Sequence, residues 1–300
     1  MRGRGTWDLG LGAWGMGRGV IAALALGVAP LSAQQKVPLV LHHLVLDVDS
    51  VTWNDIAHSP FIRDQFAANE TGYLNPPDAG TGIRLMGKYS YLQLMPSPSP
   101  AFVGIMLAAE RAGGLATLRG QGAFQDARQT SVRGHGESQG VRVAELSDRI
   151  RPAGVDSASP RVGFELLQYT TDAARRRSSI DSLSEANRSN VRFFAEYFDS
   201  GKFFSHLTGA TLAIPVDDIA RISRVLERDG VAVTHDGEGA IIKLDGFTLH
   251  LIPPYRGAGV KQLQFALTHA APANPNYRFG PKSQLRFGPG LIAVWDFDVK

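Results

Sequence analysis

The chain has 300 residues, of which 44% are hydrophobic and 20% are charged, with a formal net charge of +3 and no cysteine. This composition excludes a mainly disordered chain, because its apolar residues are numerous enough to fill a core. The lack of cysteine excludes a disulfide framework, a thiolate metal site and a cysteine nucleophile. The 33 glycines and 17 prolines indicate many short elements joined by turns, which favours a β-rich fold.

Residues 1–33 are typical of a secretory signal peptide. Three arginines precede an apolar run at 20–31, and the small pair Ser32-Ala33 follows it. A basic start, a short apolar core and a small residue before a polar stretch are the parts of such a signal. The run is too short to cross a hydrocarbon core about 30 Å thick as a helix. We therefore expect a secreted or periplasmic protein with no stable membrane span after signal removal; an uncleaved anchor is the alternative.

The same segment accounts for most of the net charge. It holds three of the 31 Lys and Arg residues and one of the 28 Asp and Glu residues, which leaves the mature chain near +1. A nearly neutral chain gives no reason to expect a nucleic-acid partner. The short run Arg175-Arg176-Arg177 is interpreted as a solvated connector.

In chain order, residues 40–48 predict a strand, and Asp49-Ser50 predicts the N-cap of a helix over 51–66. A hairpin is expected at 83–86 and 89–95, followed by looser strands at 102–108, 130–133, 141–146 and 162–169. Residues 171–207 are expected to form a helical connector. The rest predicts a strand at 212–214, a helix that starts at 215–218, a meander at 231–234, 240–244 and 247–252, and strand-like stretches at 262–268 and 285–297.

The order strand, helix, strand, strand at 40–95 recurs at 209–252. Aligning Val48-Asp49 with Val216-Asp217 places His43 over Thr211, and at the far end Gln93 lies over His250. A repeated unit usually needs a neighbouring copy to bury its sheet face. We therefore predict an α+β fold of repeated βαβββ-type modules, in which curved, mainly antiparallel sheets carry helices on the outer face.

Four stretches carry a family resemblance: LHHLVLDVDS, GKYSYLQL, VGFELLQY and HLTGATLAIP. The pattern resembles the vicinal-oxygen-chelate superfamily, the glyoxalase and bleomycin-resistance proteins, and the last three stretches look like an uncharacterised bacterial family of glyoxalase-like proteins. The resemblance covers nearly all of the mature chain. It implies a first glyoxalase-like domain at 34–170 with two modules, the helical connector at 171–207, and a second glyoxalase-like region at 208–300.

The resemblance also implies a metal site. Metal-binding members of the superfamily take His, Gln or Glu ligands from the first and last strands of paired modules. Carried over to this chain, these positions are His43, Gln93 and Glu165. Imidazole and carboxylate ligands suit a divalent Zn, Fe, Ni or Mn ion.

Strand alternation extends this site to a substrate cavity. Because successive side chains on a strand point to opposite faces, Tyr91 is expected on the same face as Gln93, and Thr248 on the same face as His250. Together with Thr211, these residues are expected to line a concave cavity for a small molecule. The same alternation predicts that His42 faces away from His43 as a structural histidine.

Two functions remain open. One is a metal-dependent lyase, isomerase or dioxygenase of the glyoxalase type, in which the ion polarises substrate oxygens. The other is a non-catalytic protein that binds or sequesters a small molecule without a metal. The segment at 136–140 matches the G-x-S-x-G motif of serine hydrolases, but the strand-like pattern that follows it indicates a hairpin loop.

Overall fold

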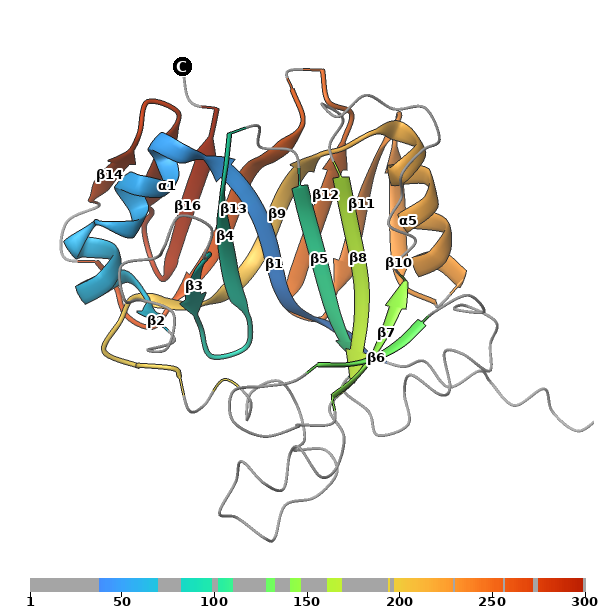
Figure 1. Cartoon of the computed structure of the whole chain (residues 1–300), viewed down its shortest axis with the longest axis horizontal. Helices are drawn as coiled ribbons and strands as arrows, with labels where there is room; N and C mark the ends of the chain where they lie inside the picture. Colours follow the sequence, from blue (N-terminus) through green and yellow to red (C-terminus); the bar gives the residue numbers. More distant parts are fainter. Residues whose placement is uncertain are drawn as a thin grey trace, which may run out of the picture. The chain divides into compact units, whose positions relative to one another are not determined.

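The computed structural model describes residues 38–69, 82–98, 102–109, 128–132, 141–146, 161–168, 194, 197–228, 230–255, 257–271 and 275–298, and of 128–132, 141–146, 161, 165–168 and 228 the backbone alone. The expected signal peptide, the arginine run and the 136–140 motif lie outside these residues. Strands dominate, and they form two mixed sheets with a few helices, which is an α+β fold (Figure 1). None of the helices in the described ranges is long and apolar enough to cross a membrane.

The first sheet has the strand order β2-β3-β4-β1-β5-β8-β7-β6. Its strands are β1 (Leu39–Asp49), β2 (Ala68–Asn69), β3 (Ile83–Met86), β4 (Tyr91–Ser97), β5 (Phe102–Ala109), β6 (Arg128–Val132), β7 (Val141–Leu146) and β8 (Arg161–Gln168). The pairs β1/β4 and β5/β8 are parallel, and the other neighbours are antiparallel.

The second sheet has the order β10-β11-β12-β9-β13-β16-β15-β14. Its strands are β9 (Phe204–Ala213), β10 (Ala232–Asp236), β11 (Gly239–Leu244), β12 (Phe247–Ile252), β13 (Gly259–Leu267), β14 (Asn276–Phe279), β15 (Ser283–Phe287) and β16 (Ile292–Phe297). Here β9/β12 is parallel, because the helix α5 (Val216–Arg228) returns the chain before the meander. The pair β13/β16 is antiparallel. The link between β13 and β14, at 268–275, is shorter than the dozen or so residues that a crossover between parallel strands requires.

The helical segment after β1 is interrupted. The expected helix at 51–66 forms as α1 (Ser50–Ala57) and, after a break at His58-Ser59, resumes at Pro60 and ends in a π-helical turn, η1 (Ile62–Phe66). Proline lacks a backbone N–H and disfavours helical geometry in the residue before it. The N-cap prediction is confirmed, because the Asp49 carboxylate accepts hydrogen bonds from the first-turn backbone.

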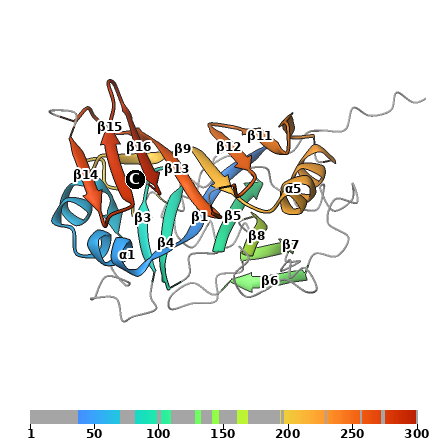
Figure 2. The same ribbon diagram turned by 90° about the horizontal axis from the view of Figure 1, so that it is seen from above.

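The two sheets, α1, η1 and α5 share one buried apolar core. In β1 the core residues Leu44, Leu46 and Val48 alternate with the less buried Val45 and Asp47, as period-two patterning predicts. Helix α1 contacts β1 and β4 of the first sheet and β14 of the second (Figure 2). Helix α1 therefore packs against both sheets and connects their parts of the core.

Two element boundaries differ from the sequence prediction. Strand β9 begins at Phe204, so the last residues of the expected connector 171–207 are strand. The strand-like stretch 285–297 contains a turn, because Gly288-Pro289-Gly290 separates β15 from β16 and Gly290 has a φ of 81°. A positive φ is readily adopted by glycine, and proline cannot donate to a sheet ladder.

Candidate functional site

A β-bulge in β1 places His42 and His43 on the same side of the strand. Pairing with β5 passes from Leu41 opposite Leu107 directly to His43 opposite Met106, so His42 is the extra residue of the bulge. The extra residue bends the strand, and the two Nδ1 atoms of the imidazoles lie 2.6 Å apart. The expectation that the two histidines face opposite ways holds for a regular strand and is wrong here.

The histidine pair is buried among aromatic rings. The ring of His43 stacks on Tyr91 with centroids 4.2 Å apart, and Phe194 lies 5.1 Å from the ring of His42. Burial lowers the pKa of His42 to about 3. Burial, then electrostatic repulsion from the protonated form of His42 and from Arg84, lower the pKa of His43 well below its ordinary value. Both imidazoles are therefore neutral at pH 7.

The hydrogen bond between the rings sets complementary tautomers. In one imidazole Nδ1 carries the proton and donates it, which leaves Nε2 as an acceptor. The other imidazole accepts at Nδ1 and carries its proton on Nε2. The pair thus presents one acceptor and one donor at its two Nε2 atoms, with either histidine in either role.

Gln93 pairs with Val45, which is two residues after His43 on β1. Its Oε1 accepts a hydrogen bond from Arg84 Nε at 3.4 Å, and its Nε2 donates to the sulfur of Met95 at 3.2 Å. Arg84 therefore brings a positive charge to the face on which a metal was expected.

The backbones of Glu165 and His43 lie level with each other across the sheet, with one strand between them. Met106 on β5 pairs with His43 on one side and with Glu165 on the other. Adjacent strands are about 4.8 Å apart, so the backbones of His43 and Glu165 are separated by about 10 Å. The side chain of Glu165 lies outside the described part of the chain.

The side chains described around His43 do not fit a divalent metal. No three His, Cys, Asp or Glu side chains within the described ranges could hold an ion together. The Nδ1 atoms of His42 and His43 bond to each other, and the amide of Gln93 is occupied by Arg84 and Met95. A guanidinium beside the site also opposes a second positive charge.

The other expected cavity residues lie on the second sheet. Thr211 on β9 pairs with His250 on β12, and Thr248 pairs with Gly209. The seven predicted site residues thus form two groups, with His43, Gln93, Glu165 and Tyr91 on one sheet and the remaining three on the other. The alignment of the repeated unit matched His43 with Thr211 and Gln93 with His250, and the strand pairing shows that these two matches cannot both hold. Gln93 pairs with Val45, whereas His250 pairs with Thr211. Matching Gln93 to His250 therefore matches Val45, not His43, to Thr211.

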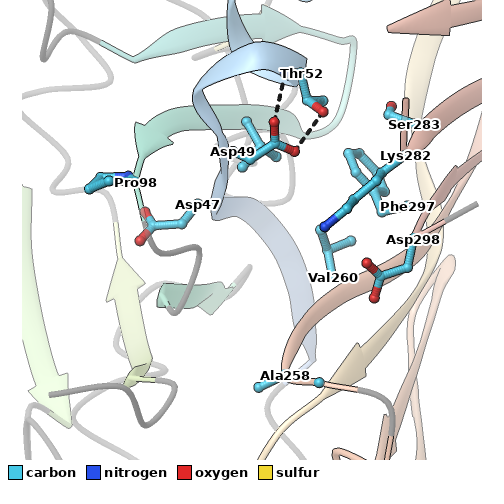
Figure 3. Close-up of a pocket in the computed structure, with 12 residues that line it drawn as sticks. Asp47, Asp49, Thr52, Pro98, Ala258, Val260, Lys282, Ser283, Phe297 and Asp298 are labelled. Carbon is cyan, nitrogen blue, oxygen red and sulfur yellow. Dashed lines mark hydrogen bonds between the residues drawn. The ribbon is translucent and has the colours of Figure 1, made fainter. Parts of the chain in front are cut away.

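A pocket of about 480 Å³ opens at the C-terminal end of β1 (Figure 3). None of the seven predicted site residues lines it. Its wall consists of Asp47, Val48, Asp49, Thr52 and Pro98 from the first sheet and α1, and of Gly257, Ala258, Val260, Lys282, Ser283, Phe297 and Asp298 from the second sheet and its turns. Ligand pockets commonly have volumes of roughly 300–1,000 Å³.

Asp49 gives the pocket a fixed negative charge. Its carboxylate accepts hydrogen bonds from the backbone N–H of Val51 at 3.1 Å and of Thr52 at 3.0 Å, and from the Thr52 hydroxyl at 2.7 Å. Burial raises the pKa of Asp49, but these hydrogen bonds and the charge of Lys282 outweigh burial, so the pKa lies below its ordinary value. Asp49 is therefore ionised at neutral pH.

The opposite wall carries Lys282 and Asp298. Lys282 forms no hydrogen bond or ion pair with any residue that the structure describes, whereas Asp298 is paired with Lys261. Asp298 has a φ of 66°, which places it in the left-handed region that non-glycine residues seldom adopt. Such backbone strain often accompanies functional sites. No local motif marks Lys282 or Asp298, so sequence reasoning could not place them here.

Comparison with known proteins gives neighbours in structure only. No family model matches the sequence, and no curated protein matches it. The chain is similar to an extradiol ring-cleaving dioxygenase from B. fuscum, with 15% identity and a TM-score of 0.39 over 75% of this chain and 56% of that one. It is also similar to a variant of homoprotocatechuate 2,3-dioxygenase from B. fuscum (13% identity, TM-score 0.43, 89% and 74% covered) and to a hypothetical protein from Staphylococcus aureus (10%, 0.40, 74% and 88%).

The chain spans little more than half the length of the first of these dioxygenases. At such identities and TM-scores, function has to be inferred from the chain's own residues.

Proposed function

We propose that this chain is an exported small-molecule-binding protein of the vicinal-oxygen-chelate superfamily, and that its ligand occupies the pocket at the end of β1. The pocket is the observation that carries the proposal. It combines a suitable volume with apolar walls at Val48, Val260 and Phe297 and with a few charged groups. The strained backbone of Asp298 at its rim supports the same assignment.

The strand order supports the superfamily assignment. In each sheet the two central strands, β1 and β5 or β9 and β13, are each followed in sequence by a meander that extends to the sheet edge. The parallel pairs β1/β4, β5/β8 and β9/β12 are the arrangement that βαβββ-type modules produce. On this proposal the first sheet is the 34–170 domain and the second sheet is the core of the 208–300 region. Export rests on the composition of residues 1–33.

The proposal is tested with a variant that fills the pocket. We expect a screen of small organic molecules by thermal denaturation to find hits that stabilise the mature protein, by about 2.7 kcal/mol at a hundredfold excess over Kd. Ala258→Trp places an indole in the pocket and should abolish these shifts. Ala232→Trp, at an exposed position on β10, is the matched control and should retain them. Hits that stabilise both variants equally would contradict the pocket assignment.

A metal-dependent enzyme of the glyoxalase type is the second candidate, and the level position of His43 and Glu165 across the first sheet favours it. Because the described donors around His43 bond to each other and to Arg84, we expect purified protein to contain far less than one equivalent of Zn, Fe, Ni or Mn. Elemental analysis by mass spectrometry measures this directly. One full equivalent that is lost in both His43→Ala and Glu165→Ala would favour the enzyme over the binding protein.

A further inference from the structure

We infer that the pocket at the end of β1 selects a small zwitterion, in which a protonated amine and a carboxylate are joined by a short apolar chain. This inference rests on the proposed function, because it names the ligand class of the same site. The charges of the two pocket walls and the apolar surface between them carry it.

The wall from the first sheet is negative. Asp47 and Asp49, two residues apart on β1, both line the pocket, and no basic residue of that sheet lines it among the residues described. Asp47 accepts a hydrogen bond from the backbone N–H of Phe102 at 3.2 Å, and Asp49 is held by the first turn of α1. Fixed carboxylates of this kind attract a cationic group without needing to reorganise.

The facing wall supplies a positive charge that forms no ion pair among the described residues, although it helps to lower the pKa of Asp49. The side chain of Lys282 extends into the space between Asp49 and Asp298 (Figure 3). The charge of Asp298 is already matched by Lys261, whereas the ammonium of Lys282 has no hydrogen-bond or ion-pair partner in the described structure. A ligand carboxylate would form a charge-assisted hydrogen bond with the ammonium of Lys282.

An apolar strip joins the two charged walls. Val48 and Val260 are buried, and Phe297 is held in place by stacking on Trp295 at 5.5 Å. A simple anion entering the pocket would face three carboxylates, and a simple cation would face Lys282. A molecule with both charges and a short methylene chain satisfies both walls and covers the strip.

Titration of the mature protein with a graded series of ligands tests the inference. The probes are glycine, β-alanine, 4-aminobutyrate and 6-aminohexanoate, each compared by NMR with the amine and the carboxylate of the same chain length. We expect at least one zwitterion to bind at least tenfold more tightly than either single-charge analogue. Lys282→Gln and Asp49→Asn should each weaken that binding about tenfold. Asparagine remains a good N-cap, so Asp49→Asn preserves α1, and Asp236→Asn, exposed on β10, should change nothing.

Every other outcome overturns the inference. If an amine binds best and Lys282→Gln tightens its binding, the pocket is a cation site. If zwitterions bind no better than their analogues, or if both charge variants leave binding unchanged, charge does not select the ligand. The proposed function survives these results as long as library hits are lost in Ala258→Trp, and it fails separately if no hit depends on that position.

Discussion

Lowering the pH from 7.5 to 5 is expected to cost the folded protein about 2 kcal/mol of stability through His42, with a further loss through His43. Their pKa values in the folded chain lie far below 6.5, at about 3 for His42. In the unfolded chain both titrate near 6.5, so below that pH the unfolded state binds protons that the native state cannot. Stability is therefore lost as the pH falls through 6.5, by about 2 kcal/mol for His42 at pH 5 and by a further amount for His43.

Chemical denaturation at a series of pH values measures this loss. The double variant His42→Asn/His43→Asn removes both titrating rings, and it should show a much flatter dependence between pH 7.5 and 5. The pKa of His206 is lowered by partial burial and by the charge of Lys88, so a smaller loss in the same direction should persist in the variant. Equal slopes in the two proteins would mean that the histidine pair is not buried as a neutral unit.

Replacing Phe66 with alanine is expected to destabilise the protein by about 3–5 kcal/mol. Phe66 belongs to η1, yet its fully buried ring packs against Phe204, Phe265 and Trp295 of the second sheet. The substitution would leave a cavity among aromatic rings that cannot collapse without moving β9, β13 and β16. The loss should therefore exceed that of an average core substitution.

Equilibrium unfolding in urea, followed by tryptophan fluorescence, measures the effect of Phe66→Ala. Phe66→Leu keeps part of the volume and should cost markedly less, and Tyr255→Ala, at a side chain that is 80% exposed, should stay within about 0.5 kcal/mol of wild type. A cost below about 1 kcal/mol for Phe66→Ala would show that η1 does not pack into the second sheet.

Much of the fold follows from local patterns in the sequence. Alternation in β1, the cap at Asp49, and the turns at Asp236-Gly237 and Asp245-Gly246 each depend on a few neighbouring residues. Gly237 and Gly246 have φ values of 59° and 69°, which is the backbone geometry that such tight turns require. Local patterns also indicated a helix between β9 and β10.

The histidine pair could be found from the sequence, but its geometry could not. The LHHL pattern predicts a regular strand. The bulge at His42 depends on pairing with β5, which is more than fifty residues away in the sequence. Without the bulge, alternation sends the two rings to opposite faces. A shift of one residue in the pairing between β1 and β5 brings the two imidazoles together as a hydrogen-bonded pair.

The pocket could not be predicted from the sequence for a similar reason. Asp49 was recognised as a helix cap, but Lys282 and Asp298 reach it from turns more than two hundred residues later. Neither lies in a motif, and the strain at Asp298 is a property of its backbone and not of its residue type. Only the packing of the second sheet against the end of β1 brings these groups together.

Isothermal titration calorimetry with the strongest library hit tests most directly whether the ligand binds in the pocket of Figure 3 or beside the histidine pair. The measurement compares Ala258→Trp in the pocket with His43→Asn on the face of the first sheet. We expect the pocket variant to lose at least tenfold in affinity and His43→Asn to keep the affinity of the wild type. Loss of binding in His43→Asn, with Ala258→Trp unaffected, would contradict the pocket assignment and place the ligand at the histidine pair.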